Sequence, residues 1–252
     1  MKILCCFKVV PDYEMLGQEE WTRGGLPDTR FVRNIYSCYD ESALELVLRE
    51  KDRGGCEAEA LTVKKAECVF ASGNLYAVGY DRVTELLCAD PGHRAEILAD
   101  YARSAAPDCI VMGCQSQDEN GFQTPCRTAE LLGWPCIPDV YDFTCAEAGR
   151  LLVRQREQGV SRELLVELPC VLSVGNVPKT FLRIPTLRQK MAAKEKSVVR
   201  IEREAGGTYP EPVLEDVVYL QKFRSPVSLT AGQMLEMLRK LEDGSLGEGL
   251  ER

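Results

Sequence analysis

Short apolar segments alternate with amphipathic segments along the first half of the chain. Apolar or β-branched residues fill four stretches that predict buried strands, at 3–10, 58–63, 82–87 and 109–113. Apolar positions at helical spacing predict a helix after each of them, at 37–54, 66–78, 95–105 and 123–132. Four consecutive strand-and-helix units favour a doubly wound α/β domain with a mostly parallel sheet and right-handed crossovers.

The first helix has a defined start and end in the sequence. Ser37 and Asp40 have the Ser-x-x-Asp spacing of a capping box, which predicts that the helix begins there. Gly54 and Gly55 end its apolar repeat, and Gly79 closes the second helix in the same way.

The pattern changes after Pro135, where short alternating segments replace the strand-and-helix units. Segments 140–143, 151–156 and 164–168 predict antiparallel strands at an edge of the sheet. Segment 170–174 is apolar again, and we expect it to re-enter the sheet.

The C-terminal part carries a different kind of sequence. Window 183–203 has seven Lys or Arg residues against two Glu residues, which indicates a solvated loop or a contact with a partner. Little periodicity follows over 206–227, and then 231–241 places its apolar residues on one helical stripe. We therefore expect an α/β domain over 1–203 and an arm over 204–252 that docks through this helix.

The composition excludes several classes of partner. The 252 residues are 45% hydrophobic and carry a formal net charge of −8, which disfavours binding to the phosphate backbone of nucleic acids. Every apolar run is shorter than the ~20 residues that span a bilayer, and the N-terminal residues lack the features of a secretion signal. The sequence therefore predicts a cytoplasmic protein with no membrane span and no nucleic-acid partner.

Twelve cysteines stand out in this composition. A cytoplasmic chain of this length needs no disulfides, so we expect reduced thiols. No Cys-x-x-Cys occurs and His93 is the only histidine, so the usual spacing of a zinc or iron–sulfur site is missing. We expect His93 to be solvated at a helix start, and Cys109 and Cys170 to be buried. Cys5 and Cys6 should point to opposite faces of one strand.

The best candidate for a binding site is the loop 113–124, between the fourth strand and its helix. Ligands of open α/β sheets bind beyond the carboxyl ends of the strands, beside the N-termini of the helices that follow. Gly113 and Gly121 allow close approach of the backbone, and Gln123 and Thr124 offer hydrogen bonds to a phosphate. The loop lacks the Gly-Lys-Ser/Thr of a nucleotide hydrolase. A capped loop without a ligand is the alternative at this point.

Several short motifs together resemble the β subunit of electron transfer flavoproteins. The loop 113–124 is similar to that family's Gly-Lys/Arg-Gln-x-x-Asp-x-Asp/Asn-x-x-Gln-x loop. Further matching stretches, in the family's order, are Lys8-Val9-Val10-Pro11-Asp12, Tyr39-Asp40-Glu41-x-Ala43-Leu44-Glu45, Gly79-Tyr80-Asp81-Arg82, Ala129-Glu130-Leu131-Leu132-Gly133-Trp134-Pro135, Leu168-Pro169-Cys170-Val171 and Arg183-Ile184-Pro185-Thr186-Leu187. The resemblance extends from the start of the chain to about residue 203.

The resemblance implies a heterodimer with a flavin-carrying α subunit, which moves electrons from flavin dehydrogenases to an acceptor oxidoreductase. In this family the β subunit binds AMP or, in electron-bifurcating members, a second FAD, while a redox FAD is shared with the α subunit. The chain is thus expected to be an electron carrier subunit rather than a bond-making enzyme, with no catalytic residue of its own and no metal.

The resemblance also assigns roles to individual residues. The positions that match the family's nucleotide contacts are Cys6, Ser37, Cys38, Tyr39, Asp40, Val63, Gly113, Cys114, Gln115, Ser116, Gln117, Asp118, Glu119, Asn120, Gly121, Phe122, Gln123 and Thr124. The positions that match its recognition loop for the dehydrogenase are Arg183, Ile184, Pro185, Thr186, Leu187 and Arg188. Leu187 is the expected anchor of that loop, and the alternative for this leucine is a place in the chain's own core.

Two departures from the family pattern concern the nucleotide. Cys114 stands where the family usually has Lys or Arg, and Ser37 and Cys38 replace Asn-Pro. Phosphate binding would then depend on backbone N–H groups and neutral side chains, unless Lys8 points inward. Two alternatives without a redox role stay open, an adenine-nucleotide-binding module of the universal-stress type and an adenine-nucleotide hydrolase or ligase. The second lacks its Gly-rich loop after the first strand.

Overall fold

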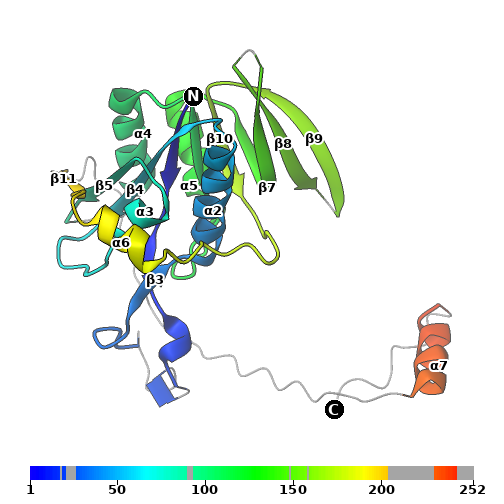
Figure 1. Cartoon of the computed structure of the whole chain (residues 1–252). Coiled ribbons are helices and arrows are strands. Elements are labelled where there is room, and N and C mark those ends of the chain that lie inside the picture. Colours follow the sequence, from blue (N-terminus) through cyan, green and yellow to red (C-terminus); the bar gives the residue numbers. More distant parts are fainter. Residues whose placement is uncertain are drawn as a thin grey trace. The chain divides into compact units, whose positions relative to one another are not determined.

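The apolar segments of the first half form the centre of one nine-stranded sheet (Figure 1). The computed structural model describes residues 1–17, 19–20, 27–89, 93–147, 149–157, 159–203 and 230–242. The strands lie in the order β11 (Val199–Glu202), β5 (Arg82–Leu87), β4 (Glu57–Lys64), β1 (Lys2–Cys6), β6 (Cys109–Gly113), β10 (Cys170–Val174), β7 (Cys136–Ala146), β8 (Arg150–Glu157) and β9 (Val160–Glu167).

The direction of the strands confirms the predicted fold class. Every neighbouring pair from β11 to β7 is parallel, while β8 and β9 add antiparallel strands at one edge. The predicted re-entry of 170–174 is confirmed, because β10 lies between β6 and β7.

Helices cover both faces of the parallel part of the sheet. The core on one face includes residues of α2 (Cys38–Asp52) and α3 (Asn74–Val78). The core on the other face includes residues of α4 (Arg94–Ala105) and α5 (Thr124–Leu132). The result is a three-layer arrangement of helices, sheet and helices, as a doubly wound sheet requires.

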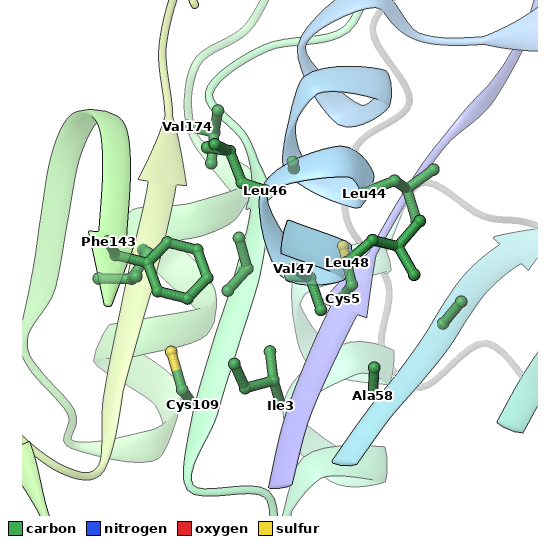
Figure 2. Packing of buried hydrophobic residues seen from close by; sticks show 14 of the residues in the cluster. Ile3, Cys5, Leu44, Leu46, Val47, Leu48, Ala58, Cys109, Phe143 and Val174 are labelled. Carbon is green, nitrogen blue, oxygen red and sulfur yellow. The ribbon is translucent and has the colours of Figure 1, made fainter. Parts of the chain in front are cut away.

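Aliphatic side chains of α2 fill the first core. Figure 2 shows Leu44, Val47 and Leu48 of α2 above the strands, beside Ile3 of β1. Phe143 of β7 joins the same cluster, so one core runs from the parallel strands into the antiparallel edge.

The structure confirms the predicted environments of four cysteines. Cys5 belongs to the core cluster on the α2 side and Cys6 to the cluster on the α4 side, so they face opposite sides of β1. Cys109 and Cys170 are fully buried. All twelve cysteines are free thiols in the structure.

The predicted strand 3–10 is in fact two strands in different sheets. β1 ends at Cys6, and β2 (Val9–Pro11) pairs antiparallel with β3 (Asn34–Tyr36) in a separate two-stranded sheet. The main strand stops because the Lys8 N–H donates to the Asp40 carboxylate, 2.8 Å away, and not to a neighbouring strand. A single 3-10 turn, Tyr13–Met15, follows β2.

The helix predicted at 66–78 is reduced to α3, its last five residues. Phe70 in the preceding segment packs its ring edge-on against Tyr36 of β3, with ring centroids 4.8 Å apart. This contact with another element outweighs the local helical pattern. Gly79 ends α3 at a φ of 124°, which confirms it as the helix stop.

The predicted start of the first helix is confirmed, but the predicted capping box and the predicted exposure of His93 are wrong. Ser37 precedes α2 as its N-cap residue, but its side chain makes no capping hydrogen bond. The capping box does not form because Asp40 turns its carboxylate to the backbone of Lys8 and Gly113. His93 is not solvated: it is buried as the N-cap residue of α4, a helix whose inner face packs on the sheet.

The cationic window 183–203 contains two regular elements. α6 (Leu187–Ala193) begins with a capping box between Thr186 and Gln189. β11 then forms a parallel edge strand beside β5. The charge pattern of this window predicts a solvated loop or a partner contact instead of a strand. Ile201 of this strand packs against the core on the α4 side, and this contact explains why the segment is ordered.

The chain divides into two units, Met1–Glu215 and Asp216–Arg252. The helix predicted at 231–241 is present in the second unit as α7 (Ala231–Glu242). The prediction for 206–227 lies outside the described residues. Within the described ranges, no helix is long and apolar enough to cross a membrane.

Candidate functional site

A pocket opens at the carboxyl ends of β1 and β6, where the order of the strands reverses. After β1 the chain adds β4 and β5 on one side, and β6 then follows on the other side of β1. In an open α/β sheet, loops that leave neighbouring strands in opposite directions create a crevice at such a point. Phe7 and Lys8 after β1 and most of the 113–124 loop after β6 line this switch-point pocket.

Asp40 joins the two strand ends that form the pocket. Its Oδ2 accepts the backbone N–H of Lys8 at 2.8 Å, and its Oδ1 accepts the backbone N–H of Gly113 at 2.7 Å. One carboxyl from the first turn of α2 therefore satisfies a backbone donor just beyond β1 and another at the end of β6. It holds both loops at a fixed separation.

Gly113 is required by the closeness of α2. A Cβ at this position would lie 2.6 Å from Asp40 Oδ1 and 2.8 Å from both the backbone nitrogen of Asp40 and the carbonyl carbon of Tyr39. Since two of these three atoms are backbone, no side-chain rotation relieves the contact. A larger residue would push α2 away from the pocket and break the hydrogen bonds of Asp40.

The carboxyl of Asp40 is poised between its two charge states near neutral pH. Burial raises the pKa of Asp40 to about 7, against the opposing effect of the two backbone hydrogen bonds and the positive charge of Lys8. The net charge of the pocket therefore changes within the physiological range.

Two cations and two carboxylates form an ionic cluster at the pocket. The Lys8 ammonium lies 2.7 Å from Asp118 Oδ2 and 3.0 Å from Glu119 Oε1, and the Arg94 guanidinium lies 2.8 Å from Glu119 Oε1. Lys8 also donates to Ser116 Oγ at 3.3 Å. Lys8 thus points toward the loop.

The cluster keeps its acids ionised. Burial by itself raises the pKa of Asp118 and of Glu119, but Lys8 and Arg94 outweigh it and hold both values below normal. Each cation is therefore neutralised by a carboxylate of the loop. An entering anion would have to share or displace these carboxylates.

Cys114 contributes no charge to the pocket. Burial, assisted by the charge of Asp139, raises the pKa of its thiol to about 11, so the side chain is neutral at pH 7. The positive charges that line the pocket come from Lys8, Arg94 and Arg127, which the chain supplies from outside the loop.

Two buried polar atoms at the pocket have no hydrogen-bond partner within the described part of the chain. They are Gln115 Oε1 and Arg94 Nε, one acceptor and one donor. Buried polar atoms are paired in the great majority of cases, so both are available as partners for a polar ligand. Gln123 and Thr124 line the same pocket at the start of α5, whose first N–H groups have no partner within the helix.

Most of the residues expected to contact a nucleotide line the switch-point pocket. Those that line it are Cys6, Asp40, Val63, Gly113, Cys114, Gln115, Ser116, Glu119, Gly121, Phe122, Gln123 and Thr124. Those that do not are Ser37, Cys38, Tyr39, Gln117, Asp118 and Asn120. Asp118 still reaches the pocket indirectly through Lys8.

Sequence reasoning misses the side of the pocket that α4 contributes. Arg94 and Glu96 of its first turn line the pocket, and Glu96 forms an ion pair with Arg127 of α5. The sequence does contain a sign of this contribution. α4 follows β5, so its first turn lies at the same carboxyl edge of the sheet as the pocket. The three-group clusters of His, Cys, Asp and Glu that hold metals are absent from the described residues.

The predicted recognition segment is tethered at one end and exposed at the other. Arg183 pairs with Glu45 at 3.0 Å and with Asp52 at 2.7 Å, both on α2, which holds the start of the segment against the fold. Ile184 is 89% exposed and Leu187, at the start of α6, is 75% exposed. The alternative of Leu187 as a core residue is therefore wrong.

Comparison with known proteins gives consistent matches over most of the chain. The family described as "Electron transfer flavoprotein domain" matches residues 30–205. The putative electron transfer flavoprotein subunit YgcR of Escherichia coli K12 is 31% identical over 79% of this chain and 81% of its own length. The electron transfer flavoprotein subunit beta of Syntrophomonas wolfei is 29% identical over 94% and 90%. The mitochondrial subunit beta of Arabidopsis thaliana is 29% identical over 80% and 81%.

Proposed function

Because the chain belongs to the electron transfer flavoprotein family, we propose that it is a β-type subunit holding an adenine nucleotide, AMP or FAD, in the switch-point pocket. The observation that carries the proposal is the pocket itself, where Gln115 Oε1 and Arg94 Nε have no partner in the described ranges and the start of α5 lies beside them. These groups bind and orient a ligand. The subunit contributes to electron transfer by position, as a carrier and not as a bond-making enzyme.

Lys8 and Arg94 are the proposed phosphate partners in place of the cation that is missing at position 114. Both line the pocket, and both are paired with carboxylates of the loop. A phosphate replaces a carboxylate as the acceptor, while Arg94 Nε adds a donor that has no partner among the described residues. This exchange of partners supports binding without a lysine or arginine in the loop.

The proposed partner is a flavin-carrying α subunit, with which the chain shares the redox FAD. The name of the Syntrophomonas wolfei relative, subunit beta, points to an assembly with a second kind of subunit. The arm 204–252 is proposed to dock on that subunit. Met234, Leu235 and Leu238 of α7 support this role, because large apolar side chains that are exposed on a helix favour a partner surface.

The segment 183–188 is proposed to contact the donor dehydrogenase, with Leu187 as its anchor. Leu187 and Met191 of α6 are exposed apolar residues, and Arg188 and Lys190 flank them with positive charge. Exposed apolar side chains surrounded by positive charge suit a partner surface with an apolar pocket surrounded by acidic residues. The apolar contact would hold the complex, and the charges would mainly accelerate encounter.

The proposal is tested by identifying what the assembled protein carries. The chain is co-expressed with its α subunit, and the small molecules released by denaturing the purified complex are identified by mass spectrometry. We expect a yellow complex that contains AMP, or a second FAD, besides the redox FAD, and a colourless chain when it is purified alone. The variant Lys8→Met/Arg94→Met should still form the yellow complex but lose the nucleotide of this pocket. A colourless complex without any adenine nucleotide would contradict the proposal.

A further inference from the structure

Two pairs of cysteines have the same separation but opposite surroundings. Cys126 and Cys136 bring their Sγ atoms to 3.8 Å, and so do Cys109 and Cys170. Cys126 is exposed and Cys136 is half-buried, whereas Cys109 and Cys170 are both 0% exposed. The pairs therefore share a geometry and differ in their access to a solvent oxidant.

The surface pair can close into a disulfide with a small movement. A disulfide needs about 2.05 Å between the sulfur atoms, so each Sγ must move by about 0.9 Å, within reach of a side-chain rotation. Cys126 lies in the first turn of α5 and Cys136 is the first residue of β7, so each thiol sits near the end of its element.

We propose that Cys126 and Cys136 are a reversible thiol switch that a hydroperoxide closes into a disulfide. The exposed Cys126 thiolate attacks a peroxide oxygen and becomes a sulfenic acid, releasing the first water. Cys136 then attacks the sulfur of Cys126, forms the S–S bond and expels the oxygen as a second water. The two thiols lose two electrons and two protons, and hydrogen peroxide is reduced to two waters. A thiol reductant reverses the step by exchange.

The order of the two steps follows from burial. Burial raises the pKa of Cys136 to about 12, and the neighbouring Cys126 adds to this shift, so Cys136 is a weak first nucleophile. Cys126 meets the oxidant first because its side chain is exposed. Cys136 is less exposed than Cys126 and lies next to the sulfur that it must attack.

The position of the switch connects it to the switch-point pocket. Pro125 and Arg127, on either side of Cys126, both line that pocket. A disulfide would therefore fasten the first turn of α5 to the start of β7. This inference does not depend on which ligand the pocket binds, so it can fail or succeed independently of the proposed function.

The experiment compares the two thiol pairs within one sample. The purified full chain is exposed to a small excess of hydrogen peroxide, its remaining thiols are blocked with N-ethylmaleimide, and peptides from a non-reducing digest are analysed by mass spectrometry. We expect the twelve titratable thiols to fall by two, with a linked peptide pair that contains Cys126 and Cys136. Dithiothreitol should restore both thiols, and Cys109 and Cys170 should remain reduced throughout.

Variants separate the switch from general thiol oxidation. Cys126→Ser should lose the linked peptide, while Cys68→Ser, which removes a half-buried thiol elsewhere in the chain, should retain it. Recovery of Cys126 and Cys136 as unlinked alkylated or overoxidised residues would overturn the proposal. Equally fast linkage of Cys109 to Cys170 would overturn it as well, since exposure would then not be the deciding factor.

Discussion

At the scale of single residues, Asp40 contributes both structure and charge to the switch-point pocket. It holds the ends of β1 and β6 together through two backbone hydrogen bonds, and its own charge varies near pH 7. The sequence predicts two roles for this residue, as part of a helix cap and, through the family resemblance, as a nucleotide contact. Its actual partners, Lys8 and Gly113, are 32 and 73 positions away in the chain, so local sequence could not reveal them.

Nucleotide affinity should fall as the pH rises through about 7, because Asp40 then gains a negative charge at the pocket. The negative charge of ionised Asp40 near the phosphate costs on the order of 1 kcal/mol of binding free energy, or about fivefold in Kd. Calorimetric titration with AMP from about pH 6 to about pH 8 measures the change. AMP itself ionises near pH 6, so the control is Asp40→Asn, whose profile should be flatter than that of the wild type. Parallel profiles would show that Asp40 does not titrate beside the ligand.

Gln123→Leu and Thr124→Val should each weaken nucleotide binding by about 1 kcal/mol or more, because each removes a polar group from the lining of the pocket. Occupancy of the purified complex, measured by mass spectrometry, reports the loss. Gln117→Leu is the matched control, since Gln117 lies in the same loop but does not line the pocket. Full occupancy in the first two variants would place the ligand elsewhere.

At the scale of elements, regular patterns are predictable and elements that depend on distant contacts are not. β5 and β6 match their predicted bounds. β6 is a continuous apolar run, which is enough to define a buried strand. β11 alternates half-buried and exposed residues over only four positions, and charged neighbours obscure that pattern. This strand forms through its pairing with β5 and through the ion pair of Arg200 with Glu85. Both partners are distant in the chain, so the local sequence does not reveal them.

Leu187→Ala should leave the fold intact and slow electron transfer from the donor dehydrogenase. The side chain is 75% exposed, so its removal creates no cavity, whereas its burial on docking would contribute roughly 1.5–3 kcal/mol. Stopped-flow reduction of the flavin at limiting dehydrogenase concentration measures the effect, and thermal melting checks the fold. Val160→Ala, an exposed apolar residue of β9 at the opposite edge of the sheet, should change neither. An unchanged reduction rate would remove Leu187 from the docking surface.

At the scale of the whole molecule, one core joins the parallel strands to the antiparallel edge, which the sequence predicts as two separate patterns. The doubly wound half and the antiparallel edge are both visible in the sequence as separate patterns. Their union is not visible, because it depends on Phe143 and on β10 lying beside both β6 and β7. The pocket follows the same rule: its loop is contiguous and predictable, while Lys8 and Arg94 arrive from two other strand ends.

Phe143→Ala should destabilise the entire first unit by about 3–5 kcal/mol, because it opens a cavity in the shared core. Urea unfolding followed by circular dichroism should show one transition at a lower midpoint. Leu165→Ala, at an exposed position of β9, should stay within about 0.5 kcal/mol of the wild type. Two separate transitions in Phe143→Ala would mean that the antiparallel edge unfolds independently.

Removal of residues 216–252 should preserve the first unit and abolish stable association with the α subunit. The boundary lies between the two units, and among the described residues the core clusters draw on the first unit alone. The melting temperature of the truncated chain and its elution with the α subunit on size exclusion test both halves of the expectation. Normal co-elution would assign the main interface to the first unit.

The place of β10 sets a constraint on synthesis at the ribosome. β7, β8 and β9 leave the exit tunnel before β10, but β10 is the strand that connects them to β6. Until residue 174 has emerged, this three-stranded meander has no edge of the parallel sheet to join, and Phe143 has no complete core around it. At about 5–20 residues per second, the interval from the end of β7 to the end of β10 lasts a few seconds. During that interval β7 keeps one edge without a neighbouring strand and Phe143 lacks part of its cover, so we expect the nascent chain to be most open to chaperone binding at this stage.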